Sequence, residues 1–455
     1  MRDLSELLLR GERARLFPVL ADTSREGRTL SIFLSCFETV DEMGRALLGG
    51  LGVKVGARTK IETYTEVVLK KGDGQQAVRP DGLIIVTNGA NQWVALVEAK
   101  VGNSDLTNEQ VEAYLSLAKL NGIDALVTLS NQFASLPTHH PLNIGSVSRR
   151  KAALFHWSWM YVVTQSTLLL NNDEVTDREQ RVILREMSRF LLHPSSGVRG
   201  FDQMPACWTE MVSKVVAGGS VSANTPEARE IIGAWHQEVG NLSLVLSRQL
   251  GTSVKVRMSR AHAADPTERQ KAAQKALAER AQLTTSLEVP DCAAPIEVCA
   301  DLRTRSLTIS LWLKAPEEPK GAKAKLNWLL RQLHKAEPAG IHIRSYWPGR
   351  AAFTQHPLSA LREDPDLIGA DHPGQSLLSF EVILSKDLGS RFAQRKNFIV
   401  DLEAAVPEFY LQVAEHVKAW QPRAPRLKDE KKDADDVGTE ALRDELEQEA
   451  LAGEA

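Results

Sequence analysis

Two short apolar segments and the polar turn between them decide the fold of the first part of the chain: RPDGLIIV (Arg79–Val86), TNGAN (Thr87–Asn91) and QWVALVEAK (Gln92–Lys100). Both apolar segments are rich in valine, isoleucine and leucine, and the turn contains Asn and Gly, so the pattern predicts a β-hairpin. Asp81 stands where the first strand begins, and Glu98 and Lys100 stand near the end of the second. Because side chains alternate along a strand, Glu98 and Lys100 point to the same face of the sheet.

These three charged side chains predict a site for a hard metal ion. Two carboxylates at close range raise each other's pKa unless a cation lies between them. Mg²⁺ binds carboxylates and water, and Lys100 can stabilise developing negative charge or orient an activated water. The alternatives are that Asp81 only accepts hydrogen bonds in the turn and that Glu98 and Lys100 form an exposed ion pair. We expect Mg²⁺ as the cofactor, with Mn²⁺ able to replace it.

A helix is predicted directly after the hairpin. The segment TNEQVEAY (Thr107–Tyr114) begins with a capping-box pattern, and it places Gln110 and Tyr114 one turn apart on one face. The next segment, IDALVTLS (Ile123–Ser130), has the composition of a buried strand. A helix between two such strands predicts a βαβ unit with a parallel strand pair.

Together these motifs resemble a known family. Pro80-Asp81, followed after a hairpin by Glu98-Ala99-Lys100, resembles the signature of the PD-(D/E)XK nuclease superfamily, and Gln110 with Tyr114 is similar to the Gln/Tyr motif of its RecB-like branch. The resemblance covers roughly the first third of the chain, and the C-terminal part is not recognised. It implies a mixed sheet flanked by helices, which is a restriction-endonuclease-like core, and Mg²⁺-dependent cleavage of DNA. It also implies that Asp81 and Glu98 bind the metal and that Lys100 acts in catalysis. Gln110 and Tyr114 would then contact the nucleic acid or support the metal ligands.

In the resembled family a glutamate from the first helix often completes the metal site. We predict one helix over residues 29–48, because apolar residues recur there at helical spacing and two glycines follow. Glu42 is our first choice for the metal ligand and catalytic carboxylate, and Glu38, on the same face, is the second. Glu66, on a predicted strand over residues 61–69, is a third candidate, although alternation favours its exposure. Each helix glutamate is equally explained as a surface carboxylate.

Length and spacing predict several domains. The chain has 455 residues, enough for two or three domains with their own cores. We divide it into a nuclease-like α/β domain (1–195), a helical connector (196–252), an α+β accessory domain with an antiparallel sheet (253–421) and a charged disordered tail (422–455).

Composition indicates the compartment of the protein and the kinds of partner it can bind. No apolar run is long enough to span a bilayer, and the first residues do not form a secretory signal, so no membrane partner is expected. The four cysteines show neither metal-ligand nor disulfide spacing, which favours a reduced cytoplasm. The net charge of −3 means that nucleic acid must be bound by local patches. In the accessory domain, Arg344, Trp347, Arg350 and Lys386 form either such a patch or an ordinary solvated face. Adjacent His139 and His140 are predicted in a surface turn, because neighbours on a loop rarely chelate one ion.

The sequence therefore predicts a cytoplasmic, Mg²⁺-dependent nuclease, and the resemblance suggests an endonuclease of bacterial genome defence or repair. DNA is expected as the substrate in preference to RNA, and a homodimer is left open. The alternative is a catalytically silent nuclease-fold scaffold whose C-terminal domain binds nucleic acid or a protein partner. The complete Asp, Glu and Lys set argues against that alternative.

Overall fold

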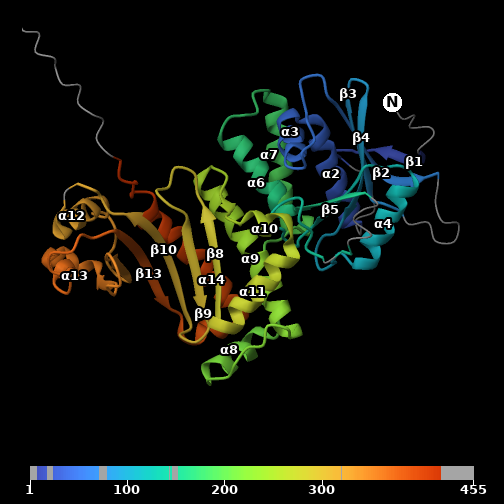
Figure 1. Cartoon of the computed structure of the whole chain (residues 1–455). Coiled ribbons are helices and arrows are strands. Elements are labelled where there is room, and N and C mark those ends of the chain that lie inside the picture. The colour runs from blue at the N-terminus through green and yellow to red at the C-terminus, as the bar shows by residue number, and fades with distance from the viewer. Residues whose placement is uncertain are drawn as a thin grey trace, which may run out of the picture. The chain divides into compact units, whose positions relative to one another are not determined.

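The computed structural model describes residues 8–17, 24–70, 79–142, 144–145, 152–318 and 320–421 (Figure 1). The predicted tail, 422–455, lies outside the described residues. The described part contains an α/β arrangement around a mixed sheet and, further along the chain, a second sheet that is wholly antiparallel. No described helix is both long and apolar enough to cross a membrane.

The first sheet has six strands that lie in chain order. They are β1 (Leu8–Arg13), β2 (Lys60–Leu69), β3 (Gly82–Asn88), β4 (Asn91–Ala99), β5 (Ala125–Ser130) and β6 (Ala153–Ser158). Strands β1 to β4 pair antiparallel, whereas β5 pairs parallel with both β4 and β6. The predicted β3–β4 hairpin and the parallel β4–α4–β5 unit are both confirmed, with α4 at Asn108–Leu120. The edge strand β1 was not predicted.

Helices cover both faces of this sheet (Figure 1). On one face lie α2 (Arg25–Thr39), α3 (Asp41–Gly49), α6 (Trp159–Asn171) and α7 (Arg178–Leu192), and on the other lies α4. Alternate residues of β3 enter the two cores, with Ile84 in the first and Leu83 in the second. Coverage on both faces explains why the hairpin strands read as continuous apolar runs.

The single helix predicted over residues 29–48 is wrong, because the chain forms two helices there. Val40 adopts an extended backbone, with φ −98° and ψ 102°, between the end of α2 and the start of α3. A β-branched residue favours that conformation, and Asp41 and Glu42 favour a new helix start through their charge. Helix α2 also begins earlier than predicted, at Arg25.

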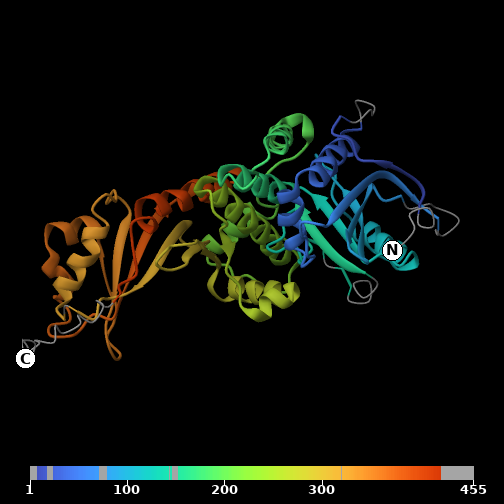
Figure 2. The same ribbon diagram turned by 90° about the horizontal axis from the view of Figure 1, so that it is seen from above.

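After α7 the chain forms α8 (Trp208–Val216) and α9 (Pro226–Leu250), then the short strand β7 (Lys255–Val256), and then α10 (Arg260–Ala264) and α11 (Pro266–Arg280). The second sheet has the order β12-β11-β13-β10-β9-β8-β7, and all its pairs are antiparallel, as predicted. Its strands are β7 (Lys255–Val256), β8 (Gln282–Glu288), β9 (Ile296–Asp301), β10 (Ser306–Lys314), β11 (Ile341–Tyr346), β12 (Thr354–Pro357) and β13 (Ser379–Asp387). Helices α12 (Ala322–Gln332), α13 (Leu358–Glu363) and α14 (Arg395–Phe409) complete this part. Figure 2 shows α14, in orange-red, beside the strands of the sheet that it contacts.

Candidate active site

Asp81 is held against the end of β4 by backbone contacts. Its Oδ2 accepts a hydrogen bond of 2.9 Å from the backbone N–H of Ala99. The next residue, Gly82, has no room for a side chain, because a Cβ there would lie 2.9 Å from Leu34 Cδ1 and 3.0 Å from the carbonyl oxygen of Tyr64. The close packing around Gly82 thus positions the carboxylate that precedes it.

Glu98 and Lys100 lie beside Asp81 at the end of the neighbouring strand. The side chain of Glu98 is 2% exposed, and its Oε1 lies 2.7 Å from Lys100 Nζ. The ammonium of Lys100 also donates to Glu26 Oε1 at 2.9 Å. The backbone of Lys100 is fixed at both ends, since its N–H donates to Leu129 and its carbonyl accepts from Trp159 Nε1. The lysine therefore has little freedom to leave the two carboxylates.

Electrostatics join these side chains into one cluster. Burial, assisted by the charge of Glu98, raises the pKa of Asp81 to about 8. Burial lowers the pKa of Lys100, but the hydrogen bond and charge of Glu98 outweigh that effect, so the pKa is raised overall. Burial and the charge of Glu98 also raise the pKa of Tyr114. Asp81, Glu98 and Lys100, the three groups predicted from the hairpin, therefore interact electrostatically with one another. Tyr114 lies close enough for their charges to change its pKa.

The two residues predicted on α4 are both buried at their polar atoms. The hydroxyl of Tyr114 donates to the carbonyl of Arg79, at 3.1 Å, two residues before Asp81. Gln110 donates its backbone N–H to Thr107, which confirms the helix cap. The Oε1 atom of Gln110 is buried without a hydrogen-bond partner in the described structure. Gln110 therefore lies in the helix cap through its backbone, and its side chain carries an unsatisfied acceptor.

The structure brings Glu26, rather than Glu42, to the cluster. Glu42 lies in the first turn of α3 and makes no hydrogen bond or ion pair with Asp81, Glu98 or Lys100. Glu26 lies in the first turn of α2, and its charge acts on both Asp81 and Lys100. Sequence reasoning missed it because the predicted helix began at residue 29, four residues after the observed start at Arg25. An acidic residue shortly after Ser24 is a helix-start pattern that indicates the correct boundary.

The other two candidate glutamates are engaged or exposed. Glu38 accepts hydrogen bonds of 2.8 Å from the N–H and the hydroxyl of Thr63 and forms an ion pair with Arg13. Glu66 is exposed, as alternation predicted, and has a positive φ of 54°. Its backbone N–H donates a 3.3 Å hydrogen bond to the carbonyl of Asp81, and Glu66 lines a small pocket together with Arg79 and Asp81. Among the described residues, neither carboxylate forms a hydrogen bond or ion pair with Glu98 or Lys100.

A distant segment supports the start of α2 and the end of β4. Thr29 of α2 donates to the carbonyl of Ser196, and the N–H of Gly102 donates to the carbonyl of Gly197. Gly197 has a φ of 77°, and a Cβ there would lie 3.0 Å from the backbone nitrogen of Gly102. This close approach requires glycine. Residues 196 and 197, where the predicted first boundary falls, thus hold together the two elements that carry Glu26 and Lys100.

The unsatisfied acceptors at this site fit a bound cation. Glu98 Oε2, like Gln110 Oε1, is buried without a hydrogen-bond partner in the described structure, and such atoms are costly to bury. No group of three or more His, Cys, Asp or Glu side chains among the described residues is arranged to hold a metal ion. Mg²⁺, however, is usually bound through one or two carboxylates, with waters and substrate phosphates completing six ligands. Asp81 and Glu98 form a donor set of that size.

Two further expectations need correction. His139 and His140 do not lie on the surface but are 5% and 7% exposed, because the loop packs inward against β5 and α10. In the accessory domain, Trp347 is buried, and Lys386 forms an ion pair with Glu408. These two side chains therefore do not belong to a free basic patch.

Sequence reasoning also missed an exposed aromatic group on the second sheet. Trp312 and Tyr346 stack with ring centroids 4.3 Å apart, and Arg344 lies 4.7 Å from the ring centre of Phe353. The guanidinium of Arg344 also forms an ion pair with Glu381, so its charge is largely compensated.

Comparison with protein-family models, with curated proteins and with solved structures finds no match to this chain. The functional interpretation therefore depends on the geometry described above and on the motifs of the hairpin and α4.

Proposed function

We propose that this protein is a Mg²⁺-dependent nuclease whose six-stranded sheet is a restriction-endonuclease-like core of the PD-(D/E)XK type. The observation that carries the proposal is the convergence of Asp81, Glu98 and Lys100 at the ends of paired strands, with one carboxylate oxygen buried and unsatisfied. Two neighbouring carboxyl groups that are shielded from water destabilise a fold because each opposes the ionisation of the other, so their presence favours a functional role over a structural one.

In the proposed hydrolysis of a phosphodiester, each residue of the cluster has its own role. Asp81 and Glu98 would hold the Mg²⁺, which supplies a Lewis acid and makes a bound water more acidic. Lys100, kept protonated by Glu98, is placed to orient the attacking water or to stabilise the extra negative charge on the phosphate. Glu26, from the first turn of α2, positions Lys100 through their hydrogen bond, and Tyr114 and Gln110 brace the site or the substrate strand.

DNA as the substrate, endonucleolytic cutting and a role in genome defence or repair are proposed from the resemblance of the motifs alone. The donor set acts on the phosphodiester group, which DNA and RNA share.

The proposal is tested by incubating the purified full chain with supercoiled, linear and single-stranded DNA and with RNA, in Mg²⁺, Mn²⁺ or chelator. Lys100→Ala is the test variant, and Lys60→Ala is the control, because Lys60 is an exposed strand lysine in a surface ion pair. We expect metal-dependent cutting that Lys100→Ala lowers by about a hundredfold or more and that Lys60→Ala leaves unchanged. Equal cutting by both variants, or none by any, would overturn the proposal and favour a silent scaffold.

A further inference from the structure

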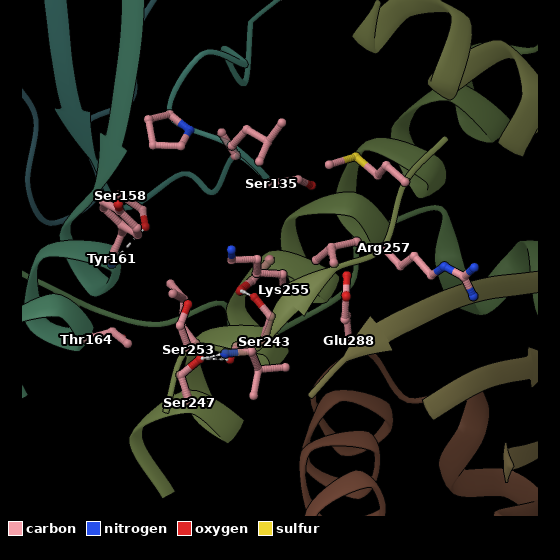
Figure 3. Close-up of a pocket in the computed structure, with 18 of the residues that line it drawn as sticks. Ser135, Ser158, Tyr161, Thr164, Ser243, Ser247, Ser253, Lys255, Arg257 and Glu288 are labelled. Atoms are coloured by element: carbon pink, nitrogen blue, oxygen red, sulfur yellow. Dashed lines mark hydrogen bonds between the residues drawn. The ribbon is translucent and has the colours of Figure 1, made fainter. Parts of the chain in front are cut away.

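A cavity separate from the carboxylate cluster lies between elements that belong to different parts of the sequence. Its volume is about 380 Å³, and it is lined by the loop 134–137, the start of α6, one face of α9 and the strand β7. Cavities of this size hold small organic ligands. Figure 3 shows Ser158 and Tyr161 on one side of it, with Lys255 and Ser253 across from them.

In the part of the chain that the structure describes, several hydroxyl groups that line the cavity do not donate to the protein, whereas three others donate to helix carbonyls: Thr164, Ser243 and Ser247. Ser158 Oγ accepts from the N–H of Tyr161, and Ser135 Oγ accepts from Arg269. Because their acceptor positions are used by the protein, both serines retain an O–H for a ligand. Within the described residues, the hydroxyls of Tyr161 and Ser253 have no hydrogen-bond partner, and both line the cavity. The wall therefore offers several donors to whatever binds there.

Charge in and behind the wall is mainly positive. Lys255 lines the cavity and has no ion-pair partner among the described residues, although Glu288 faces it in the β7–β8 register. Behind the hydroxyls, Arg269 contacts Ser135 and Arg248 contacts Thr164. Burial lowers the pKa of Arg269 only to about 10, so it stays charged at neutral pH. The nearby carboxylates are Glu288 at the wall and Glu403, whose charge acts on Arg248.

The remainder of the wall is apolar. Leu136, Pro137, Leu244, Val254 and Met258 form much of this surface. An apolar wall next to a group of donors suits a ligand with a ring at one end and an anion at the other. The volume of about 380 Å³ suits a small molecule better than a polynucleotide strand, and a bare metal cation would find one carboxylate, Glu288, beside the ammonium of Lys255.

We propose that this cavity binds a small phosphorylated organic molecule of the nucleoside monophosphate class. Lys255 and the donor hydroxyls of Ser158, Tyr161 and Ser253 hold the phosphate, and the apolar wall receives the base. The site is independent of the carboxylate cluster, since none of its lining residues belongs to that cluster.

Calorimetric titration of the full chain with AMP, ribose 5-phosphate and inorganic phosphate tests the proposal. We expect AMP to bind most tightly, because it alone supplies both the anion and the ring. Lys255→Ala should weaken AMP binding by about ten- to a hundredfold, the usual effect of losing a charge-assisted contact. Lys314→Ala is the matched control, because Lys314 is likewise an exposed strand lysine but lies outside the cavity and pairs with Glu317; it should bind AMP as the unmodified chain does.

Tyr161→Phe removes one donor without changing the packing and should weaken binding by about five- to tenfold. It keeps the test decisive if Lys255→Ala does not fold. The proposal is overturned if AMP does not bind, or if Lys255→Ala binds AMP as tightly as the unmodified chain does. Equal affinity for ribose 5-phosphate and AMP overturns the assignment of the base to the apolar wall. Asp81→Asn should bind AMP normally, so a failure of the nuclease proposal is distinguishable from a failure here.

Discussion

Asp81, which is half-buried, and Glu98, which is buried, lie close together, and Lys100 forms an ion pair with Glu98. Each charge is costly to bury, and Lys100 compensates only one of them fully, through Glu98 Oε1. A side chain that is unfavourable for the fold but well positioned by it is typical of an active site. Replacing one of the charges should therefore stabilise the protein while removing its function.

Asp81→Asn should raise the free energy of unfolding by about 1 kcal/mol in chelator, because burial and Glu98 oppose the charged form of Asp81 whereas an amide carries no charge, and the amide oxygen can still accept from Ala99. It should also abolish any stabilisation by Mg²⁺. Urea unfolding with and without Mg²⁺ measures both effects. Asp124→Asn is the control, because Asp124 also accepts a backbone N–H of β4, from Val94, at the other end of the strand. A loss of stability in chelator for Asp81→Asn alone would show that the carboxylate serves the fold.

Glu26→Gln should lower the rate of phosphodiester cleavage by about tenfold or more, the usual effect of removing a side chain that positions a catalytic group. The reason is its 2.9 Å hydrogen bond to Lys100 Nζ. Glu42→Gln should leave the rate unchanged, because Glu42 makes no such contact with the site. Initial rates at several pH values for the two variants decide between the carboxylates, and the opposite ranking would restore Glu42.

The residues that could be predicted are those whose relation is local in sequence. Strand alternation places Glu98 and Lys100 on one face, and the hairpin returns them to Asp81. Helical spacing likewise places Gln110 and Tyr114 on one face of α4. Glu26 is 74 positions from Lys100, and no periodicity relates the two. Its role follows only from how α2 packs against the sheet.

At the scale of elements, the packing of α2 against β2 and β3 depends on Gly82. Gly82→Ala should destabilise the protein by about 1–3 kcal/mol, since one of the close contacts is with rigid backbone, the Tyr64 carbonyl. It should also lower cleavage, because Asp81 is the adjacent residue. Gly233→Ala is the control, as Gly233 lies within α9 with nothing near its Cβ position, and it should be neutral or slightly stabilising. Thermal melting of both variants gives the comparison, and equal melting temperatures would contradict the packing argument.

A buried chain of hydrogen bonds joins β5, β6 and the loop that follows β5. The N–H of Leu142 donates to His140 Nδ1, so His140 Nε2 donates to Thr128 Oγ1, at 3.0 Å. Thr128 in turn donates to His156 Nδ1, and His156 Nε2 donates to the carbonyl of Gln132, both at 2.8 Å. This direction satisfies every member with both histidines neutral. The chain also explains why the predicted surface turn is buried.

Burial lowers the pKa of His156 from its ordinary value of 6.5 to about 4. Between these values the unfolded chain binds a proton at His156 that the folded protein does not, so the contribution of His156 to stability is constant above pH 6.5 and becomes unfavourable as the pH drops towards 4. His156→Gln should reduce the loss of unfolding free energy between pH 7 and 4.5 by about 2 kcal/mol. His334→Gln, at an exposed position, should leave that loss unchanged. Urea unfolding at both pH values measures the difference. An identical pH dependence in both variants would mean that His156 titrates normally.

At the scale of the whole molecule, continuous apolar runs predicted the buried strands β3, β4 and β5, and alternation predicted the antiparallel second sheet. Edge strand β1 escaped prediction because its exposed pattern lacks a regular apolar period. The break between α2 and α3 at Val40 was not predicted because the helical spacing of apolar residues continues through it. The division of the chain into four domains remains a prediction, and the 380 Å³ cavity depends on contacts between distant segments that no local pattern encodes.

The central claim is that Asp81 and Glu98 share one divalent metal ion. Anomalous diffraction from crystals of the full chain soaked in Mn²⁺ tests it most directly. We predict one strong anomalous peak between the two carboxylates, adjacent to Lys100, and its loss in Asp81→Asn crystals. The absence of a peak at saturating Mn²⁺, or a peak that persists in Asp81→Asn, would contradict the account.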